Sequence, residues 1–374
     1  MVTVAPGSTP ATPSAGERAG RLAELYADMG RNDIQSLWDQ APDLMPPSPR
    51  PRAVPWMWPW RTVLGLAERA GELVPVERGG ERRALALANP GLGGQPFATP
   101  TLWGAMQYLN AGESAPAHRH AAAAIRFVIQ GEGVWTTVNG EPCPMAPGDL
   151  VLTPSMAWHE HHSGSDDAMV WFDGLDLPLV NGLDANFFEI SEADYLQESA
   201  TRPVGSHSAA VFGHPGLLPD VLAPTDRHSP LMVYRWSATD RALTDLAGAT
   251  GRDDVTVRYV DPTSGRDALP TMRCALRRLR AGTVTTTTRT VGSSLLVVLS
   301  GHGQSVVDGV RFDWERGDVL AVPSWAPVDH RATETAEVFV VSDTPVLEAL
   351  RLDRTETLPG PQAVRQDWRE GPAA

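Results

Sequence analysis

The sequence of 374 residues predicts an all-β core of two tandem jelly-roll barrels, preceded by an α-helical N-terminal segment. Three observations predict this fold class. Short β-rich segments bounded by glycine turns recur in two separate stretches. These two stretches repeat each other, with glycines and prolines in matching places. Before them, apolar residues follow helical spacing. The high counts of Gly (34) and Pro (33) agree with many turns between short strands.

The first 80 residues divide into a polar start and a helical segment. Residues 1–16 are rich in Ala, Pro, Ser, Thr and Gly, and we expect them to be disordered. Residues 17–80 form the helical segment, with one helix over about 17–40 and a second over about 61–73. The first helix is indicated by apolar residues spaced i, i+3, i+4 and i+7. These residues are Leu22, Leu25, Tyr26 and Met29.

Strand-like segments fill residues 81–180 and return at residues 271–345, which we predict to be the first and the second barrel. In both stretches, runs of β-branched and aromatic residues are separated by turn residues. Residues 181–270 have a looser pattern and are interpreted as mixed connecting structure. Residues 346–374 are polar and are expected to form a C-terminal tail.

The two predicted barrels are copies of one another in sequence. Gly131–His161 aligns with Gly301–His330, and the register shifts by only one residue over this length. Each copy holds a Gly-Asp turn, then a Pro-Ser pair, and ends on a histidine. Such extended self-similarity indicates two copies of one structural unit.

Composition excludes several classes of function. The formal net charge is −14, from 45 acidic and 31 basic residues, so the surface is expected to repel nucleic acid and anionic lipid. No apolar run approaches the roughly 18 residues that a membrane span needs. The cysteines Cys143 and Cys274 stand apart, and no signal peptide is recognisable. Both observations favour a reducing, cytoplasmic location.

A cluster of histidines is the feature of the sequence that points most directly to a metal site. Five of the ten histidines fall between positions 118 and 162. His118 and His120 are two residues apart, so on a strand their side chains face the same side. His159 follows on a later strand. Three neutral imidazoles that meet in one barrel would hold a metal ion and leave open coordination positions. The alternative, unrelated core or surface histidines, explains this spacing less well.

The second copy serves as an internal control. The alignment places Thr288 and Thr290 where His118 and His120 stand, and Val328 where His159 stands. None of these side chains replaces an imidazole as a ligand. We therefore predict that the second barrel is metal-free and structural.

The histidine motif resembles that of the cupin superfamily, whose fold is a double-stranded β-helix. The matching residues are Gly112, His118, His120 and Gly131 in the first motif, and Gly148, Pro154 and His159 in the second. Met156 replaces a glycine of the second motif, and Ala124 stands where the first usually has a glutamate. A three-histidine site without a carboxylate resembles the gentisate 1,2-dioxygenase group, which includes salicylate and 1-hydroxy-2-naphthoate dioxygenases. The resemblance is close over residues 55–180 and extends in fold to residues 271–342.

This resemblance implies an oxidoreductase that uses Fe(2+) for extradiol-type ring cleavage and inserts both atoms of O2. The implied substrate is an ortho-hydroxy aromatic carboxylate, gentisate-like or salicylate-like, that chelates iron through its carboxylate and phenolic oxygens. The ring would open between the carbons bearing the carboxylate and the hydroxyl. The resemblance also implies a homotetramer. Gentisate, salicylate and 1-hydroxy-2-naphthoate all fit this pattern, as do catabolic and biosynthetic roles.

Two polar residues share the strand face of the ligands. Arg126 lies six residues after His120, and if strand alternation holds it points inward, where it would bind the substrate carboxylate. The alternative is a solvated arginine on the outer face. His161 lies two residues after His159, and the resemblance suggests a catalytic role at the substrate oxygens. Its counterpart His330 in the second copy keeps a structural role open.

Four more residues line up with pocket positions of the group, and a structural role remains the alternative for each. They are Arg82, Trp103, Gln107 and Asp173. Trp103 could stack on the substrate ring or pack in the core. Arg82 could be a second anionic anchor, although Arg83 beside it makes the assignment ambiguous. Asp173 could orient a ligand histidine through its ring N–H, or bind a ring substituent.

Two other functions fit the sequence less well. A different metallocupin enzyme, acting on another small acid, could use the same three histidines; product analysis with O2 uptake separates it from the dioxygenase. A non-enzymatic bicupin that binds a ligand or stores protein is the second alternative. About one iron per chain after anaerobic purification would count against it.

Overall fold

The computed structural model describes residues 14–75, 83–191, 205–220 and 228–370. The chain divides into two units, residues 1–50 and 51–374. The N-terminal unit contains α1 (Ala15–Arg31) and α2 (Leu37–Leu44), so the helix expected over residues 17–40 is two helices. A capping box starts α1: Glu17 N–H donates to Ser14 Oγ, and Ser14 N–H donates to the Glu17 carboxylate.

The first barrel, in the second unit, consists of two sheets. The strand order of one is β12-β8-β5-β10-β3-β2, and that of the other is β11-β4-β9-β6-β7. The strands are β2 (Ala84–Ala86), β3 (Trp103–Leu109), β4 (Ser114–His120), β5 (Ala124–Gln130), β6 (Val134–Val138), β7 (Glu141–Pro144), β8 (Leu150–Thr153), β9 (His159–Ser163), β10 (Met169–Leu175), β11 (Phe188–Ile190) and β12 (Val233–Tyr234).

The second barrel repeats this arrangement. Its sheets have the orders β1-β19-β16-β21-β14-β13 and β22-β15-β20-β17-β18-β23. The strands are β1 (Trp56–Trp58), β13 (Asp254–Arg258), β14 (Arg273–Leu279), β15 (Thr288–Thr290), β16 (Ser294–Ser300), β17 (Gly303–Val307), β18 (Val310–Trp314), β19 (Val319–Val322), β20 (Val328–Ala332), β21 (Ala336–Ser342), β22 (Thr355–Thr357) and β23 (Gln366–Asp367). The predicted fold class is confirmed: an all-β core of two jelly-roll barrels with an N-terminal helical segment.

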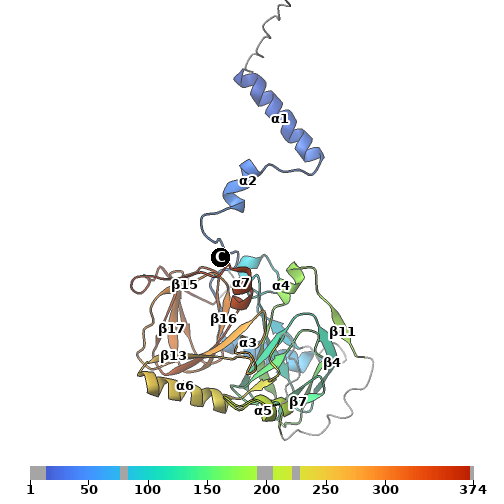
Figure 1. The fold of residues 1–374 in the computed structure, drawn as a ribbon, viewed down its shortest axis with the longest axis vertical. Helices are drawn as coiled ribbons and strands as arrows, with labels where there is room; N and C mark the ends of the chain where they lie inside the picture. The colour runs from blue at the N-terminus through green and yellow to red at the C-terminus, as the bar shows by residue number, and fades with distance from the viewer. Residues whose placement is uncertain (1–13, 76–82, 192–204, 221–227, 371–374) are drawn as a thin grey trace, which may run out of the picture. The chain divides into compact units, whose positions relative to one another are not determined.

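The two barrels lie side by side (Figure 1). One hydrophobic core contains buried residues of both. On β5, Ile125 and Phe127 face this shared core, and the Phe127 ring stacks on Phe339 of β21 at a centroid distance of 4.1 Å. Arg126, which lies between them, points to the opposite face of the strand, toward the interior of the first barrel. Both faces of β5 are therefore buried, and this alternation directs Arg126 into the barrel.

The barrels exchange edge strands. β1 precedes the first barrel in the chain but pairs with β19 of the second. β12 precedes the second barrel but pairs with β8 of the first. Each of these strands leads directly into a helix, α3 (Trp60–Leu73) after β1 and α6 (Trp236–Thr250) after β12.

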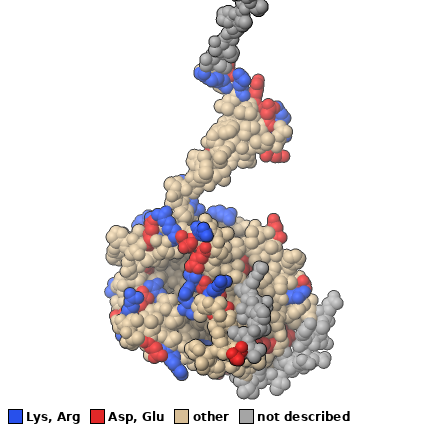
Figure 2. All heavy atoms as spheres, viewed as in Figure 1, with Lys and Arg blue, Asp and Glu red and all other residues tan. Residues whose placement is uncertain are grey.

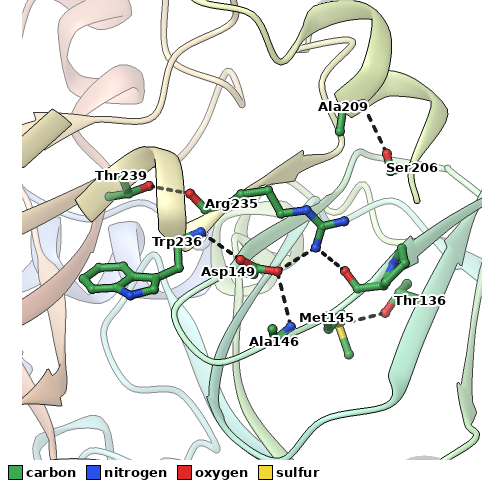
Figure 3. A network of polar contacts seen from close by, with 10 residues as sticks. Thr136, Met145, Ala146, Asp149, Ser206, Ala209, Arg235, Trp236 and Thr239 are labelled. Carbon is green, nitrogen blue, oxygen red and sulfur yellow. Dashed lines mark hydrogen bonds and ion pairs between the residues drawn. The ribbon is translucent and has the colours of Figure 1, made fainter. Parts of the chain in front are cut away.

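An aspartate of the repeated Gly-Asp turn caps each of these helices. Asp149 accepts a hydrogen bond from Trp236 N–H (2.8 Å) and one from the Arg235 guanidinium (2.7 Å), as Figure 3 shows. Asp318 accepts the equivalent bond from Trp60 N–H (2.7 Å). The glycine before Asp149, Gly148, has a φ of +84°, and a Cβ there would lie 2.9 Å from the Trp236 ring. This turn therefore needs glycine.

Some of these elements lie in segments expected to be irregular. Residues 181–270 supply β11 and β12 to the first barrel and β13 to the second, and also contain α5 (His207–Phe212). Residues 346–374 contain most of α7 (Thr344–Leu350) together with β22 and β23. The remaining helix, α4 (Leu177–Gly182), follows β10. Acidic and basic side chains lie interspersed on the face seen in Figure 2. In the described ranges, every helix is too short or too polar to cross a membrane.

Candidate metal centre

Three histidines from two neighbouring strands come together at one end of the first barrel. His118 on β4 lies directly opposite His159 on β9, with ring centroids 4.2 Å apart. The His120 ring is 4.8 Å from that of His159 and 5.9 Å from that of His118. One ligand atom from each residue lies within 4.8 Å of those of the other two. This spacing suits the binding of one metal ion between them.

The hydrogen bonds of the three rings fix their tautomers. Each Nδ1 lies close to a backbone carbonyl two residues away. A carbonyl only accepts, so each Nδ1 carries the proton and each Nε2 keeps its lone pair. The three contacts are His118 Nδ1 to Pro116 O (3.0 Å), His120 Nδ1 to Ala122 O (2.6 Å) and His159 Nδ1 to Ala157 O (2.9 Å). His159 Nε2 is buried without a hydrogen-bond partner among the described residues. The donor set therefore fits a metal.

The surroundings keep two of these imidazoles, those of His120 and His159, uncharged. Burial lowers the pKa of His120 to about 4, and the neighbouring His118 contributes. Burial, with the charge of Arg126, lowers the pKa of His159 well below its ordinary value. Both rings are therefore neutral near pH 7, the form that binds a metal.

The same register exists in the second barrel with different side chains. Thr288 on β15 lies directly opposite Val328 on β20, as His118 lies opposite His159. The second barrel contains a cavity of about 10 Å³, whose lining includes Leu296, Trp314 and His330. The first barrel contains a cavity of about 350 Å³ instead.

Nearly all of the predicted site residues line this larger cavity. They are Trp103, Gln107, His118, His120, Arg126, His159, His161 and Asp173. Arg82 lies outside the described residues. Its neighbour Arg83 is buried and bonded elsewhere, to the Glu113 carboxylate at 2.7 Å and to Val74 O at 3.0 Å.

Arg126 brings a positive charge into the cavity. Its side chain is only 3% exposed. Its Nη1 donates to Thr153 Oγ1 of β8, and its Nε lies 3.5 Å from Asp173 Oδ1 of β10. That Nε has no hydrogen-bond partner in the described part of the chain. Burial raises the pKa of Asp173 to about 6, although Arg126 and the indole N–H of Trp171 oppose this shift.

His161 lines the cavity but is also bound to the barrel wall. Its Nδ1 shares a hydrogen bond with Thr136 Oγ1 at 2.9 Å. In the second barrel, His330 shares the equivalent bond with Ser305 Oγ at 2.7 Å. This hydroxyl contact is thus a feature of both copies. Burial lowers the pKa of His161 well below its ordinary value, which leaves the ring neutral.

The sequence did not indicate several residues that line the cavity. They are Ala84, Leu175, Leu177, Asn186 and Phe188. Phe188 on β11 pairs with His120, and its ring stacks on that of His118 at 5.4 Å and 29°. It is 45% exposed. A strand of three residues has too little alternation for sequence analysis to detect.

The fold and the site define a bicupin with a three-histidine centre in its first barrel. The family model for the cupin domain matches residues 105–175. Gentisate 1,2-dioxygenase from a Streptomyces species is 50% identical over 89% of this chain and 95% of that protein. 5-Aminosalicylate 1,2-dioxygenase from a Comamonas species is 38% identical over 91% of this chain and 92% of that protein.

Solved structures agree with these relatives. The crystal structure of salicylate 1,2-dioxygenase from Pseudaminobacter salicylatoxidans superposes with a TM-score of 0.86 at 44% identity, covering 94% of this chain and 99% of that one. Its adduct with gentisate gives a TM-score of 0.87, covering 96% of this chain and 98% of that one. The chain belongs to the gentisate 1,2-dioxygenase family of bicupin ring-cleavage dioxygenases.

Proposed function

We propose that this enzyme uses Fe(2+) and O2 to cleave the ring of an ortho-hydroxy aromatic carboxylate of the gentisate or salicylate type. The observation that carries the proposal is the convergence of His118, His120 and His159 with their Nδ1 protons directed to backbone carbonyls. The relatives named for gentisate, 5-aminosalicylate and salicylate support this class of substrate.

Three neutral imidazoles leave the charge of a divalent ion uncompensated, which favours an anionic chelating substrate. Imidazole binds several transition metals, so the ligands alone fit more than iron. When bound here, ferrous iron would supply redox chemistry with O2, which zinc lacks. The dioxygenase family of the chain therefore favours iron.

The residues of the cavity would orient the substrate. Arg126 presents a buried guanidinium that is suited to bind the substrate carboxylate. Its charge is a local positive focus in a chain of net charge −14. His161, held neutral, would contact the substrate oxygens and accept or donate a proton there. Trp103 and Gln107 form the adjoining wall, and Arg82 remains a proposed second anchor.

Anaerobic loading followed by an oxygen-uptake assay tests this proposal. The protein is purified without O2, loaded with ferrous ion and analysed for metal, with about one iron per chain expected. O2 consumption is then measured on a series of ortho-hydroxy aromatic acids, and the product is analysed for both atoms of labelled O2. An iron-loaded protein that consumes no O2 with any of these acids would overturn the proposal. A different product on another small acid would favour the other metallocupin enzymes.

We further propose that the chain forms a homo-oligomer, a tetramer by resemblance to the family. The N-terminal unit supports this, because none of the large apolar side chains of α1 and α2 is buried. Those exposed include Leu22, Leu25, Leu37, Trp38 and Leu44. Side chains of this kind gain stability when a second copy covers them. The free, buried Cys143 and Cys274 agree with a cytoplasmic location.

A further inference from the structure

Four buried polar side chains, joined by three contacts, cross three strands of the first barrel. Thr153 on β8 accepts a hydrogen bond from Arg126 on β5. Arg126 faces Asp173 on β10, directly opposite in the antiparallel register. Asp173 Oδ1 accepts a hydrogen bond from Trp171 Nε1 at 3.1 Å. All four side chains are buried. We call this set the β5–β8–β10 network.

The second barrel contains the same three strands without the network. The pairings of β16 with β21 and β19 identify the counterparts by register. They are Leu296 for Arg126, Val340 for Asp173, Val322 for Thr153 and Val338 for Trp171. All four counterparts are aliphatic. The barrel therefore forms without any of these polar groups.

Buried charges carry a desolvation cost that such a pair recovers only with good geometry. Here the geometry is incomplete: Arg126 Nε has no hydrogen-bond partner among the residues described, and the ion pair spans 3.5 Å. An aliphatic set at these positions, like that of the second barrel, would avoid this cost. The network thus has a role other than stability, and two of its members, Arg126 and Asp173, line the cavity.

We infer that Thr153 and Trp171 are positioning residues for substrate binding. Thr153 holds one edge of the Arg126 guanidinium so that its other donors face the cavity. Trp171 holds the Asp173 carboxylate with its indole N–H, and its ring packs 5.4 Å from that of His161. This inference rests on the proposed function, because it requires Arg126 to bind the substrate carboxylate.

The first test removes the hydroxyl of Thr153 without changing its shape. Thr153→Val introduces the residue of the second barrel and leaves the guanidinium free to rotate. We expect KM for the best acid of the oxygen-uptake series to rise about tenfold, with kcat changed less than about threefold and iron content unchanged. Thr153→Ser restores the hydroxyl and should restore KM. The matched control is Thr137→Val, because the buried Thr137 Oγ1 has no described hydrogen-bond partner.

The second test concerns the indole N–H. Trp171→Phe keeps an aromatic ring against His161 and removes the donor to Asp173, together with part of the buried ring volume. KM should rise several-fold. Trp135→Phe is its control, because the buried Trp135 Nε1 has no hydrogen-bond partner in the described ranges. Unchanged KM in either Thr153→Val or Trp171→Phe would overturn the role inferred for the residue replaced.

Arg126→Leu separates this inference from the function on which it rests. If Arg126→Leu raises KM and Thr153→Val does not, only the positioning role is wrong. If Arg126→Leu itself leaves KM unchanged, the proposed carboxylate anchor is wrong and the positioning role falls with it. Anaerobic calorimetry with gentisate gives the affinities of the same variants without turnover. Equal affinities in the wild type and Thr153→Val would also contradict the inference.

Discussion

His118 lies directly across the β4–β9 ladder from His159, with their ring centroids 4.2 Å apart. In the second barrel the same ladder position joins Thr288 to Val328. Equivalent positions of the two barrels thus hold candidate metal ligands in the first copy and threonine or valine in the second. Exchanging side chains between the copies therefore tests function separately from fold.

Replacing a ligand by its counterpart should remove the metal and spare the fold. His159→Val introduces the residue that the second barrel tolerates at this position. We expect bound iron to fall from about one per chain to background and ring cleavage to be lost, because two imidazoles hold the ion weakly. Metal analysis and a circular dichroism spectrum measure both effects. A variant that keeps its iron would show that His159 is not a ligand.

Replacing Arg126, Asp173 and Thr153 of the β5–β8–β10 network together by the aliphatic residues of the second barrel should cost no stability. The triple variant Arg126→Leu, Asp173→Val and Thr153→Val should unfold at the same Tm as the wild type or higher, and should be inactive. Asp173→Val alone should lower Tm, because it leaves the Arg126 charge buried and unpaired. Differential scanning calorimetry compares the three proteins. A large loss of Tm in the triple variant would show that the network stabilises the barrel.

Phe188, which lines the cavity, should contribute to catalytic efficiency. Its ring stacks on the His118 ring, while its counterpart by register on β22 is Thr355. Phe188→Ala should lower kcat/KM about tenfold by loss of an aromatic contact. Ile190→Ala on the same strand is the control, because Ile190 is exposed and does not line the cavity. Equal effects of the two changes would assign Phe188 to general packing of β11.

Asp318 should give the protein a pH-dependent stability. Burial raises the pKa of this carboxyl from 3.8 to about 6, although the N–H groups of Trp60 and Glu315 lower it. The folded state then binds the proton more tightly than the unfolded state. The contribution of Asp318 is therefore most favourable below pH 4 and is lost as the pH rises through 6. The Tm of the wild type relative to Asp318→Asn should fall between pH 4 and pH 6.5, and a constant difference would contradict this assignment.

Removal of the N-terminal unit should disrupt the oligomer. A chain that begins at residue 51 lacks α1 and α2 with their exposed leucines and Trp38. We expect a smaller particle by light scattering, with the three histidines still able to bind iron. An unchanged mass would place the subunit interface on the barrels. A matched change is Leu37→Ala with Trp38→Ala in the full chain, which should weaken association without shortening the sequence.

The sequence predicted the features that depend on local spacing. The HxH pair and the matching Gly-Asp turns predicted the fold class and the three histidines that the structure brings together. Strand alternation also predicted the inward direction of Arg126. Thr153 escaped notice because its partner Arg126 lies on another strand, and single-strand patterns do not reveal such pairs. Trp171 donates to Asp173 two residues along its own strand, but a spacing of two shows only that the side chains share a face, not that they are bonded. β1 and β12 have three and two residues and join distant sheets, so periodicity could not indicate them.

The exchange of β1 and β12 means that neither half of this polypeptide is a complete folding module. Fragments produced by a cut in the chain between α5 and β12 would each carry the edge strand that the other requires. We expect such fragments to reassociate in the manner of a strand-swapped dimer. The stacked rings of Phe127 and Phe339 would then lie in the interface between the two fragments. The half that contains the three histidines therefore depends on the second half to complete its own sheet.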